Sequence, residues 1–540
     1  MYRLAPLTLA ALLAGAPAHA QELAERVDEL FSWTTPAAPG CVVAASRDGA
    51  TVIERAYGMA DLESGAPLTP ASVFDIGSVQ KQFIAAAVLL LVEDGRVSLT
   101  DDIRTYFPEM PDFGHTVTVD HLLTHTSGIR DWLGLLQFSS SDEDALTLLL
   151  RQRGLNFAPG EEWVYSNGNF LLAKVLVERV SGQSFNRFAQ ARMFRPLGMT
   201  STLYGRDARD ADNHARAYVP AGDGWGPGMM LGEERGPGAL LTTAGDLLRW
   251  NAALDEGRLG AFVTAKIQEP ARLKNGRQIG YGRALFLDEN EAGPVIWHSG
   301  SAKGYGAFLV RFPKLDISIA TLCNGGDGTE PDPRAIYELL APEAAALDHA
   351  ARAAAAAAAP TPPDVDVSGR AGLYFDAEGR SLRLLTDAGR LGIQGAGQLV
   401  ATAGGGFRPP GPSLSFRSED EFELRFTGPE TFEIISMEGA VTRYQRAEPW
   451  SPTAADLQAL AGRYESADLA AAFDVVVGQE GVRVRLNGAE NVIPISPVAR
   501  DVFQVARMTF RFVRDDAGRV VGIDHSNPVL WNVRFERVGG

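Results

Sequence analysis

The segment 74–81, FDIGSVQK, constrains this chain most, because the apolar run 83–92 follows it after a single glutamine. Gly77 permits a tight turn, and the run behind it is long enough for a buried helix, so Ser78 should lie in or near the first helical turn. Lys81 is three residues further on, which should place its amine beside the Ser78 hydroxyl. A neighbouring base makes a serine hydroxyl nucleophilic, and a lysine is such a base when burial lowers its pKa. The segment therefore predicts a nucleophile and its base at a helix start, where unpaired N–H groups favour an oxyanion.

The Ser-x-x-Lys spacing alone is a weak signal, because a capping serine followed by an exposed lysine gives the same pattern. A second motif follows Pro159 and Gly160, so it lies on a loop that leads into a helix over 169–180. This motif pairs Tyr165 with Asn167. A phenol can shuttle a proton if a cation lowers its pKa, and an amide can hold both a substrate carbonyl and the lysine. The competing interpretation is that both residues serve packing or a turn.

The third motif is the tetrapeptide 298–301, HSGS, which closes an apolar, β-rich segment. Gly300 is expected to let a substrate backbone lie close to the strand. The amide of Ser301 is expected to be the second oxyanion donor, with the amide of Ser78 as the first. Taken alone, His298 at a strand end is equally typical of a surface residue.

The three motifs, in this order, resemble those of the serine β-lactamase and penicillin-binding protein superfamily. The segments 121–129, 159–167 and 195–199 are similar to its class C β-lactamase, D,D-peptidase and D-aminopeptidase branch, and the resemblance covers about residues 25–340.

The resemblance implies a role for each motif residue. Ser78 would be the acylated nucleophile, with Lys81 as its base partner. Tyr165 would relay a proton to the leaving group, and Asn167 would contact the substrate and the lysine. His298 stands where the family has a cationic lysine, which predicts a weaker and pH-dependent charge toward a substrate carboxylate and puts strong β-lactamase activity in doubt.

The expected fold class is α+β, an antiparallel sheet flanked by helices, with two small C-terminal antiparallel β-barrels of the lipocalin-like kind. By themselves Cys41 and Cys323 fit either a disulfide or two buried thiols. The family's sheet pairs its first and last strands, which implies that these cysteines lie opposite each other and are bonded or close. The strand and hairpin signals that bracket the helical interior are 41–45, 51–53, 295–298, 306–312 and 317–322.

Composition shifts divide the chain into five parts. Residues 1–20 have the charged start, apolar stretch and Ala-His-Ala end of a signal peptide cleaved after Ala20. Residues 21–343 would be the hydrolase domain, and the Ala- and Pro-rich stretch 344–363 a linker. Two β-rich segments follow, 364–448 and 449–540, and short matches recur between them about 90 residues apart, as expected of a repeated small domain. One continuous β-domain is the alternative.

A net charge of −17 over 540 residues argues against nucleic acid or an anionic membrane as a partner. His121 and His125 have the i,i+4 spacing of metal ligands, but no glutamate of an H-E-x-x-H motif and no evident third ligand accompany them, so a structural role is favoured. No cofactor or metal is expected. The absence of a G-x-S-x-G motif disfavours an α/β-hydrolase.

The sequence therefore predicts a periplasmic or secreted serine hydrolase without a stable membrane anchor. It would cleave amide or ester bonds of small peptides that contain D-residues, as a D-aminopeptidase or D-alanyl-D-alanine carboxypeptidase does. A β-lactamase or esterase of the same fold is the enzymatic alternative. An alternative of another class is a penicillin-binding or peptidoglycan-sensing protein that is acylated but turns over poorly.

Overall fold

The chain forms two units. One comprises Met1–Arg96, Val177–Glu269 and Tyr281–Ala356, and the other Val97–Leu176, Pro270–Gly280 and Ala357–Gly540. The computed structural model describes residues 15–136, 138, 144–205, 213–228, 238–302, 304–325, 333–358, 366–377, 379–394, 397–402, 404–409, 422–436, 441–448, 450–487, 491–506, 508–527 and 529–539.

A six-stranded antiparallel sheet forms the centre of the first unit, in the order β10-β11-β12-β13-β1-β2. The first strand along the chain lies between the last strand and its own hairpin partner. It is buried throughout its apolar start, from Cys41 to Ala45, which explains why it occupies the sheet interior. The two hairpins expected from the sequence are both present. The strand bounds are β1 Cys41–Arg47, β2 Ala50–Tyr57, β10 Phe286–Asn290, β11 Gly293–Ala302, β12 Tyr305–Phe312 and β13 Ile317–Cys323.

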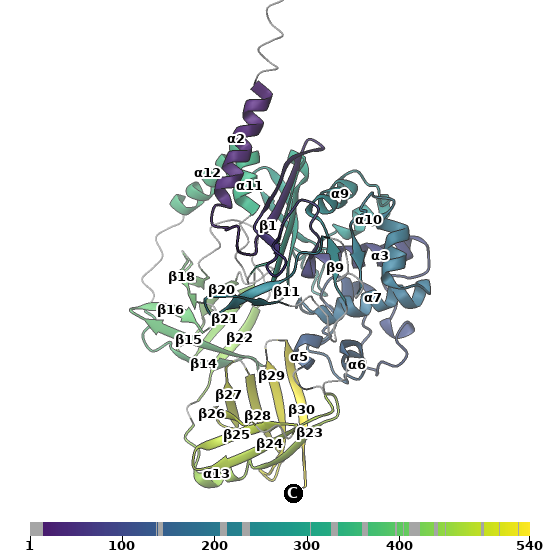
Figure 1. Ribbon diagram of the computed structural model, residues 1–540. Coiled ribbons are helices and arrows are strands. Elements are labelled where there is room, and N and C mark those ends of the chain that lie inside the picture. Colours follow the sequence, from purple (N-terminus) through teal and green to yellow (C-terminus); the bar gives the residue numbers. More distant parts are fainter. Residues whose placement is uncertain are drawn as a thin grey trace, which may run out of the picture. The chain divides into compact units, whose positions relative to one another are not determined.

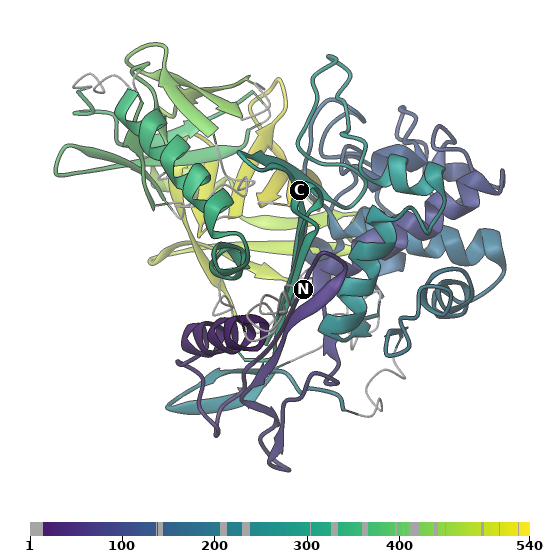
Figure 2. The same cartoon turned by 90° about the horizontal axis from the view of Figure 1, so that it is seen from above.

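Helices cover both faces of this sheet (Figures 1 and 2). Helix α9 (Ala244–Asp255) lies against β1 and β13 on one face, and α11 (Pro333–Leu340), with α2 (Gly15–Leu30) beside it, lies on the other. The apolar run that follows the Ser-x-x-Lys segment forms α3 (Lys81–Glu93), in which every residue from Lys81 to Leu91 is buried. This antiparallel sheet between helices has the predicted α+β class.

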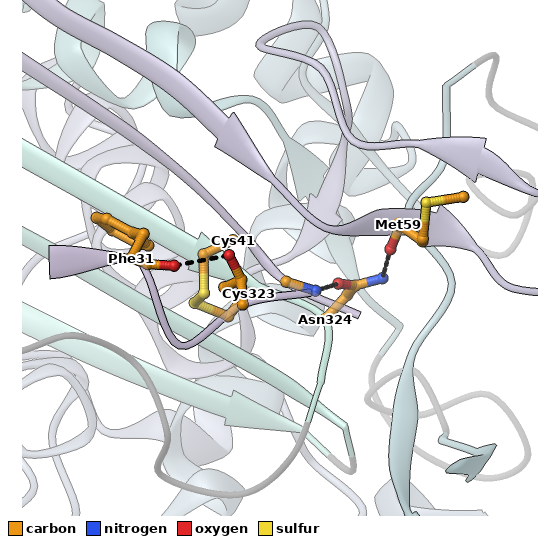
Figure 3. The surroundings of a disulfide bond; sticks show 7 residues. Phe31, Cys41, Met59, Cys323 and Asn324 are labelled. Carbon is orange, nitrogen blue, oxygen red and sulfur yellow. Dashed lines mark hydrogen bonds between the residues drawn. A yellow bond between two sulfur atoms is a disulfide. The ribbon is translucent and has the colours of Figure 1, made fainter. Parts of the chain in front are cut away.

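A disulfide joins Cys41 to Cys323, whose Cα atoms face each other at 4.0 Å across β1 and β13. The pairing implied by the family resemblance is therefore confirmed. Figure 3 shows the side chain of Asn324, which is buried and follows Cys323 in the chain. It adds two hydrogen bonds close to the disulfide. Its Oδ1 accepts from Gly40 N at 2.9 Å, and its Nδ2 donates to the Met59 carbonyl at 3.0 Å.

Short elements complete the first unit. Its remaining helices and strands are β3 Met59–Asp61, β4 Ala66–Pro67, β5 Phe74–Asp75, η1 Gly77–Gln80, α8 Phe185–Ala189, η3 Gln190–Phe194, β6 Leu203–Tyr204, β7 Tyr218–Ala221, β8 Gly224–Pro227, β9 Leu240–Thr242, α10 Ala261–Ile267, η5 Pro313–Leu315 and α12 Pro342–Ala358.

The second unit begins with short helices that are connected by capped turns. They are η2 Ile103–Thr105, α4 Val119–Leu123, α5 Trp132–Leu136, α6 Ala145–Leu150 and the start of α7 Asn167–Ser181, of which the residues through Leu176 belong to this unit. The helix expected over 169–180 is α7, and it begins at the asparagine of the second motif.

Two antiparallel β-structures form the rest of the second unit, as the sequence predicts. Strands β14–β22 form a nine-stranded sheet around its own apolar core, and β23–β30 form a closed barrel. The bounds are β14 Gly372–Phe375, β15 Ser381–Asp387, β16 Arg390–Ile393, β17 Gly397–Gln398, β18 Val400–Ala401, β19 Phe407–Arg408, β20 Phe422–Phe426, β21 Thr431–Ser436, β22 Val441–Arg446, α13 Ala454–Gln458, β23 Gly462–Ser466, β24 Ala471–Gly478, β25 Gly481–Leu486, β26 Ile493–Ala499, β27 Val502–Val505, β28 Met508–Arg514, β29 Val520–Asn527 and β30 Leu530–Val538.

The recurring sequence matches mark equivalent positions in the two β-structures. Tyr374 pairs with Arg446 across β14 and β22, and Tyr464 pairs with Arg537 across β23 and β30. Each tyrosine hydroxyl donates to the carbonyl four residues before it, and each arginine lies over the ring of its tyrosine. The same tyrosine–arginine contact therefore joins the first and last strands of both structures, as expected of a duplicated domain.

Two expectations fall partly on residues outside the described ranges. Of the stretch 344–363, residues through 358 belong to helix α12, and the Pro-rich end lies outside. Of the expected signal peptide, residues 1–14 lie outside, and α2 runs through the expected cleavage point after Ala20. Within the part of the chain that the structure describes, no helix combines the length and the apolar character needed to cross a bilayer.

Candidate active site

Ser78 and Lys81 lie where a tight turn enters helix α3. Gly77 opens the turn at φ 49°, a left-handed conformation that suits glycine, and its N–H donates to the buried carboxylate of Asp75 at 2.9 Å. Lys81 is 2% exposed, and its Nζ donates to Ser78 Oγ at 2.8 Å. The turn thus presents a hydroxyl and an amine in direct contact at the start of a buried helix.

The turn packs directly on strand β11, at the third motif. A Cβ atom built on Gly300 would lie 2.0 Å from the Ile76 carbonyl oxygen and 2.8 Å from Ser78 N, and one on Gly77 would lie 2.7 Å from Ser301 N. Both glycines are therefore needed for the contact between turn and strand. The backbone segments that carry the amides of Ser78 and Ser301, the two expected oxyanion donors, face each other here.

The role predicted for Gly300 needs correction. The space beside it is filled by the Ile76 carbonyl and the Ser78 amide, so the missing side chain makes room for the turn and not for a substrate backbone. The sequence pattern could show that a close approach is required at this position, but it could not show which segment approaches.

His298 lies in the interior beneath this contact and is 2% exposed. Its Nδ1 is 2.6 Å from the Ser299 carbonyl, which requires a proton on Nδ1 and leaves Nε2 to accept from the Tyr281 hydroxyl at 3.4 Å. Burial, and then the charge of Lys81, lower the pKa of His298 to about 3.

His298 is consequently neutral at neutral pH. Burial thus weakens the positive charge at this position, in the direction expected when a histidine replaces the family's lysine. Tyr281, which orients the imidazole, was missed by the sequence analysis; it precedes the third motif by 17 residues and belongs to no recognisable pattern.

Tyr165 and Asn167 lie in the second unit, where Asp131 holds the asparagine. Asp131 Oδ2 accepts from Asn167 N at 2.7 Å and from Asn167 Nδ2 at 2.9 Å, and the aspartate is 3% exposed. A single carboxylate oxygen thus fixes both the backbone and the side chain at the start of α7. Asp131 was also missed, because nothing in the sequence links it to a residue 36 positions away.

His125 supports the tyrosine of the same motif. Its ring centroid is 4.3 Å from that of Tyr165, and its Nδ1 accepts from Ser166 N at 3.1 Å. His125 adopts φ 58° beyond the end of α4, so it does not share a helix face with His121, whose Nδ1 accepts from Thr118 N within a capping box. The spacing considered for a metal pair is therefore not helical.

Among the described residues, no group of three or more His, Cys, Asp or Glu side chains is arranged to hold a metal ion. The first unit has a cavity of about 750 Å³, whose lining includes Asp61, His214, Arg216, Tyr218 and Tyr305 but none of the candidate catalytic residues of that unit.

This chain is similar to proteins of known families and structures. A family model described as Beta-lactamase matches residues 20–344. Penicillin-binding protein 4* of Bacillus subtilis is 29% identical over 71% of this chain and 88% of its own length. A D-aminopeptidase of Cereibacter sphaeroides is 26% identical over 93% of this chain and 92% of its own length. The octameric penicillin-binding protein homologue from Pyrococcus abyssi has a similar fold, with a TM-score of 0.51 at 20% identity over 87% of this chain and 99% of that one.

Proposed function

Because this chain belongs to the β-lactamase family, which matches it over residues 20–344, we propose that it is a serine hydrolase that forms an acyl-enzyme on Ser78. One observation carries the proposal: the buried amine of Lys81 lies 2.8 Å from the Ser78 hydroxyl. A structural lysine has no need of that contact, whereas a base must be within hydrogen-bond distance of the proton that it takes.

The reaction begins when Lys81, after losing its own proton, takes the proton of the Ser78 hydroxyl through the contact between the two side chains. The Ser78 Oγ then forms a bond to the substrate carbonyl carbon, and the resulting oxyanion accepts hydrogen bonds from the amides of Ser78 and Ser301. The bond from carbon to the leaving amine or alcohol breaks as that group takes a proton. We assign this proton transfer to Tyr165 and contact with the substrate to Asn167, on the order of the family motifs. Water then attacks the ester and releases the acid and free Ser78.

The neutral imidazole of His298 favours one class of substrate. β-Lactams and D-alanyl-D-alanine peptides both carry a carboxylate beside the scissile bond, which a cationic side chain would attract and a neutral one attracts less. Amides and esters of D-amino acids lack this carboxylate. The proposed substrates are therefore small amides or esters with a D-residue on the acyl side, in keeping with the name D-aminopeptidase of a relative that matches nearly the whole chain.

We place the reaction outside the cytoplasm. The signal-peptide pattern of residues 1–20 supports export to the periplasm or beyond, where peptides with D-residues derive from the cell wall.

Steady-state hydrolysis of three probes tests the proposal: D-alanine p-nitroanilide, a D-alanine ester and nitrocefin, with Ser78→Ala as the control. We expect the amide and the ester to be hydrolysed with a kcat/KM at least about tenfold above that for nitrocefin, and Ser78→Ala to abolish all three activities. Intact-protein mass spectrometry follows the acyl adduct. A stable adduct without turnover would identify an acylated sensor instead, and unchanged activity in Ser78→Ala would refute the proposal.

A further inference from the structure

We propose that the closed barrel β23–β30 is a brace that positions Asn167, acting through the contact of Asp468 with Arg130. All of these residues belong to the second unit. The expected effect on catalysis rests on the proposed function. The positioning of Asn167 does not, because hydrogen–deuterium exchange measures it without any activity.

The central contact is a buried ion pair between the barrel and the helical segment. Arg130 is 4% exposed, and its Nη1 donates to Asp468 Oδ2 and to Gln152 Oε1, both at 3.0 Å. Asp468 lies in the turn between β23 and β24, and its carbonyl also accepts from Gln152 Nε2 at 2.9 Å. A guanidinium buried this deeply needs a carboxylate partner, so loss of Asp468 should force Arg130 to move.

A second contact places a side chain of the helical segment among the barrel's own aromatic residues. The ring of Phe138, which is 2% exposed, lies 5.2 Å from His525 and about 6 Å from Phe473 and Phe535, measured between centroids. Asn487 Nδ2 donates to the Phe138 carbonyl at 3.0 Å. The barrel thus also surrounds Phe138, eight residues after Arg130.

A third contact joins Asn156 to the barrel. Asn156 Nδ2 donates to the Val529 carbonyl at 3.1 Å, and its Oδ1 accepts from Trp531 N at 3.0 Å. Three separate turns of the barrel therefore contact Arg130, Phe138 and Asn156. This number of contacts is too large for an incidental one.

Arg130 transmits this constraint to the catalytic motif by its position in the chain. The next residue is Asp131, whose Oδ2 fixes both nitrogens of Asn167. The Arg130 carbonyl also abuts Gly168, where an added Cβ would lie 2.9 Å from that oxygen. A shift of Arg130 should therefore displace Asp131 and the start of α7 together, without disturbing Ser78 or Lys81 chemically.

The variant Asp468→Asn tests the brace, with Asp474→Asn as the matched control, because Asp474 forms an exposed ion pair with Arg463 in the same barrel. Hydrogen–deuterium exchange on the full-length protein should rise in peptides covering 127–136 and 163–170 in Asp468→Asn only, and remain as in wild type over 372–446. With D-alanine p-nitroanilide, kcat should fall about tenfold with little change in KM. Asp468→Glu, which keeps the charge, should restore both readouts.

The two proposals fail in distinguishable ways. If wild type hydrolyses no probe, the proposed function is wrong, and the exchange data still decide whether the barrel holds Asn167. Unchanged exchange over 127–136 and 163–170 in Asp468→Asn would overturn the brace. So would an equal rise over 372–446, or the same loss of kcat in the control.

Discussion

Replacing Gly300 by alanine tests whether the packing of the turn on β11 sets the catalytic geometry. The added Cβ would lie 2.0 Å from the Ile76 carbonyl oxygen, and ordinary contacts begin near 3.4 Å, so the turn must retreat by more than 1 Å. A misplacement of this size costs about 100-fold in rate when it moves a reacting group. The turn is directly continuous with Ser78, and we therefore expect kcat/KM for D-alanine p-nitroanilide to fall at least about 100-fold.

The same substitution should affect stability far less. Overpacking by one methyl group in a well-packed interior costs about 1–3 kcal/mol, which leaves a folded protein with a melting temperature lower by only a few degrees. Gly224→Ala is the matched control, because a Cβ there meets no atom within 4 Å. Activity and thermal unfolding should be measured on the same preparations. If Gly300→Ala keeps kcat/KM within twofold of wild type, the inference that this contact positions Ser78 is wrong.

Two further predictions concern stability. Removing the disulfide with Cys41→Ala and Cys323→Ala opens a loop of 282 residues, which by chain entropy should lower the free energy of unfolding by about 5–6 kcal/mol; denaturant midpoints of the double variant and of reduced wild type should agree, and a midpoint equal to that of oxidised wild type would contradict this. His525 is fully buried in the closed barrel among phenylalanine rings, and burial lowers its pKa to about 4. The unfolded chain therefore binds the proton more tightly, and between pH 6.5 and 4 this residue should reduce the free energy of unfolding by about 1.4 kcal/mol per pH unit as the pH falls. His525→Phe should remove that part of the pH dependence in melting curves at pH 7 and 5, and identical pH slopes in variant and wild type would refute the assignment.

Local sequence patterns predicted most of the paired strands of the first unit and its buried helix. The hairpin signals over 41–53 and 306–322 correspond to paired strands, and the apolar run 83–92 forms a buried helix, because period and turn chemistry are local properties. The contact between Lys81 and Ser78 follows from their spacing of three residues in the same way.

Sequence reasoning failed where the answer depends on which segments meet. Asp131 and Tyr281 hold motif residues 36 and 17 positions away, respectively, through contacts that no periodicity encodes. The charge state of His298 depends on burial beneath a turn whose position the sequence does not specify. In each case a tertiary contact decided what the local pattern left open.

The sheet order has a consequence for how this chain is made. Strand β1 pairs with β13, which ends at Cys323, so ribosomes must add 282 further residues after Cys41 before its partner exists. At typical rates of synthesis of about 5–20 residues per second, this takes roughly 15–60 s. During that interval the newborn hairpin of β1 and β2 has an unpaired, apolar edge that invites association with other chains. A chain of this topology would therefore benefit from a chaperone that keeps it unfolded until its last sheet strand has emerged.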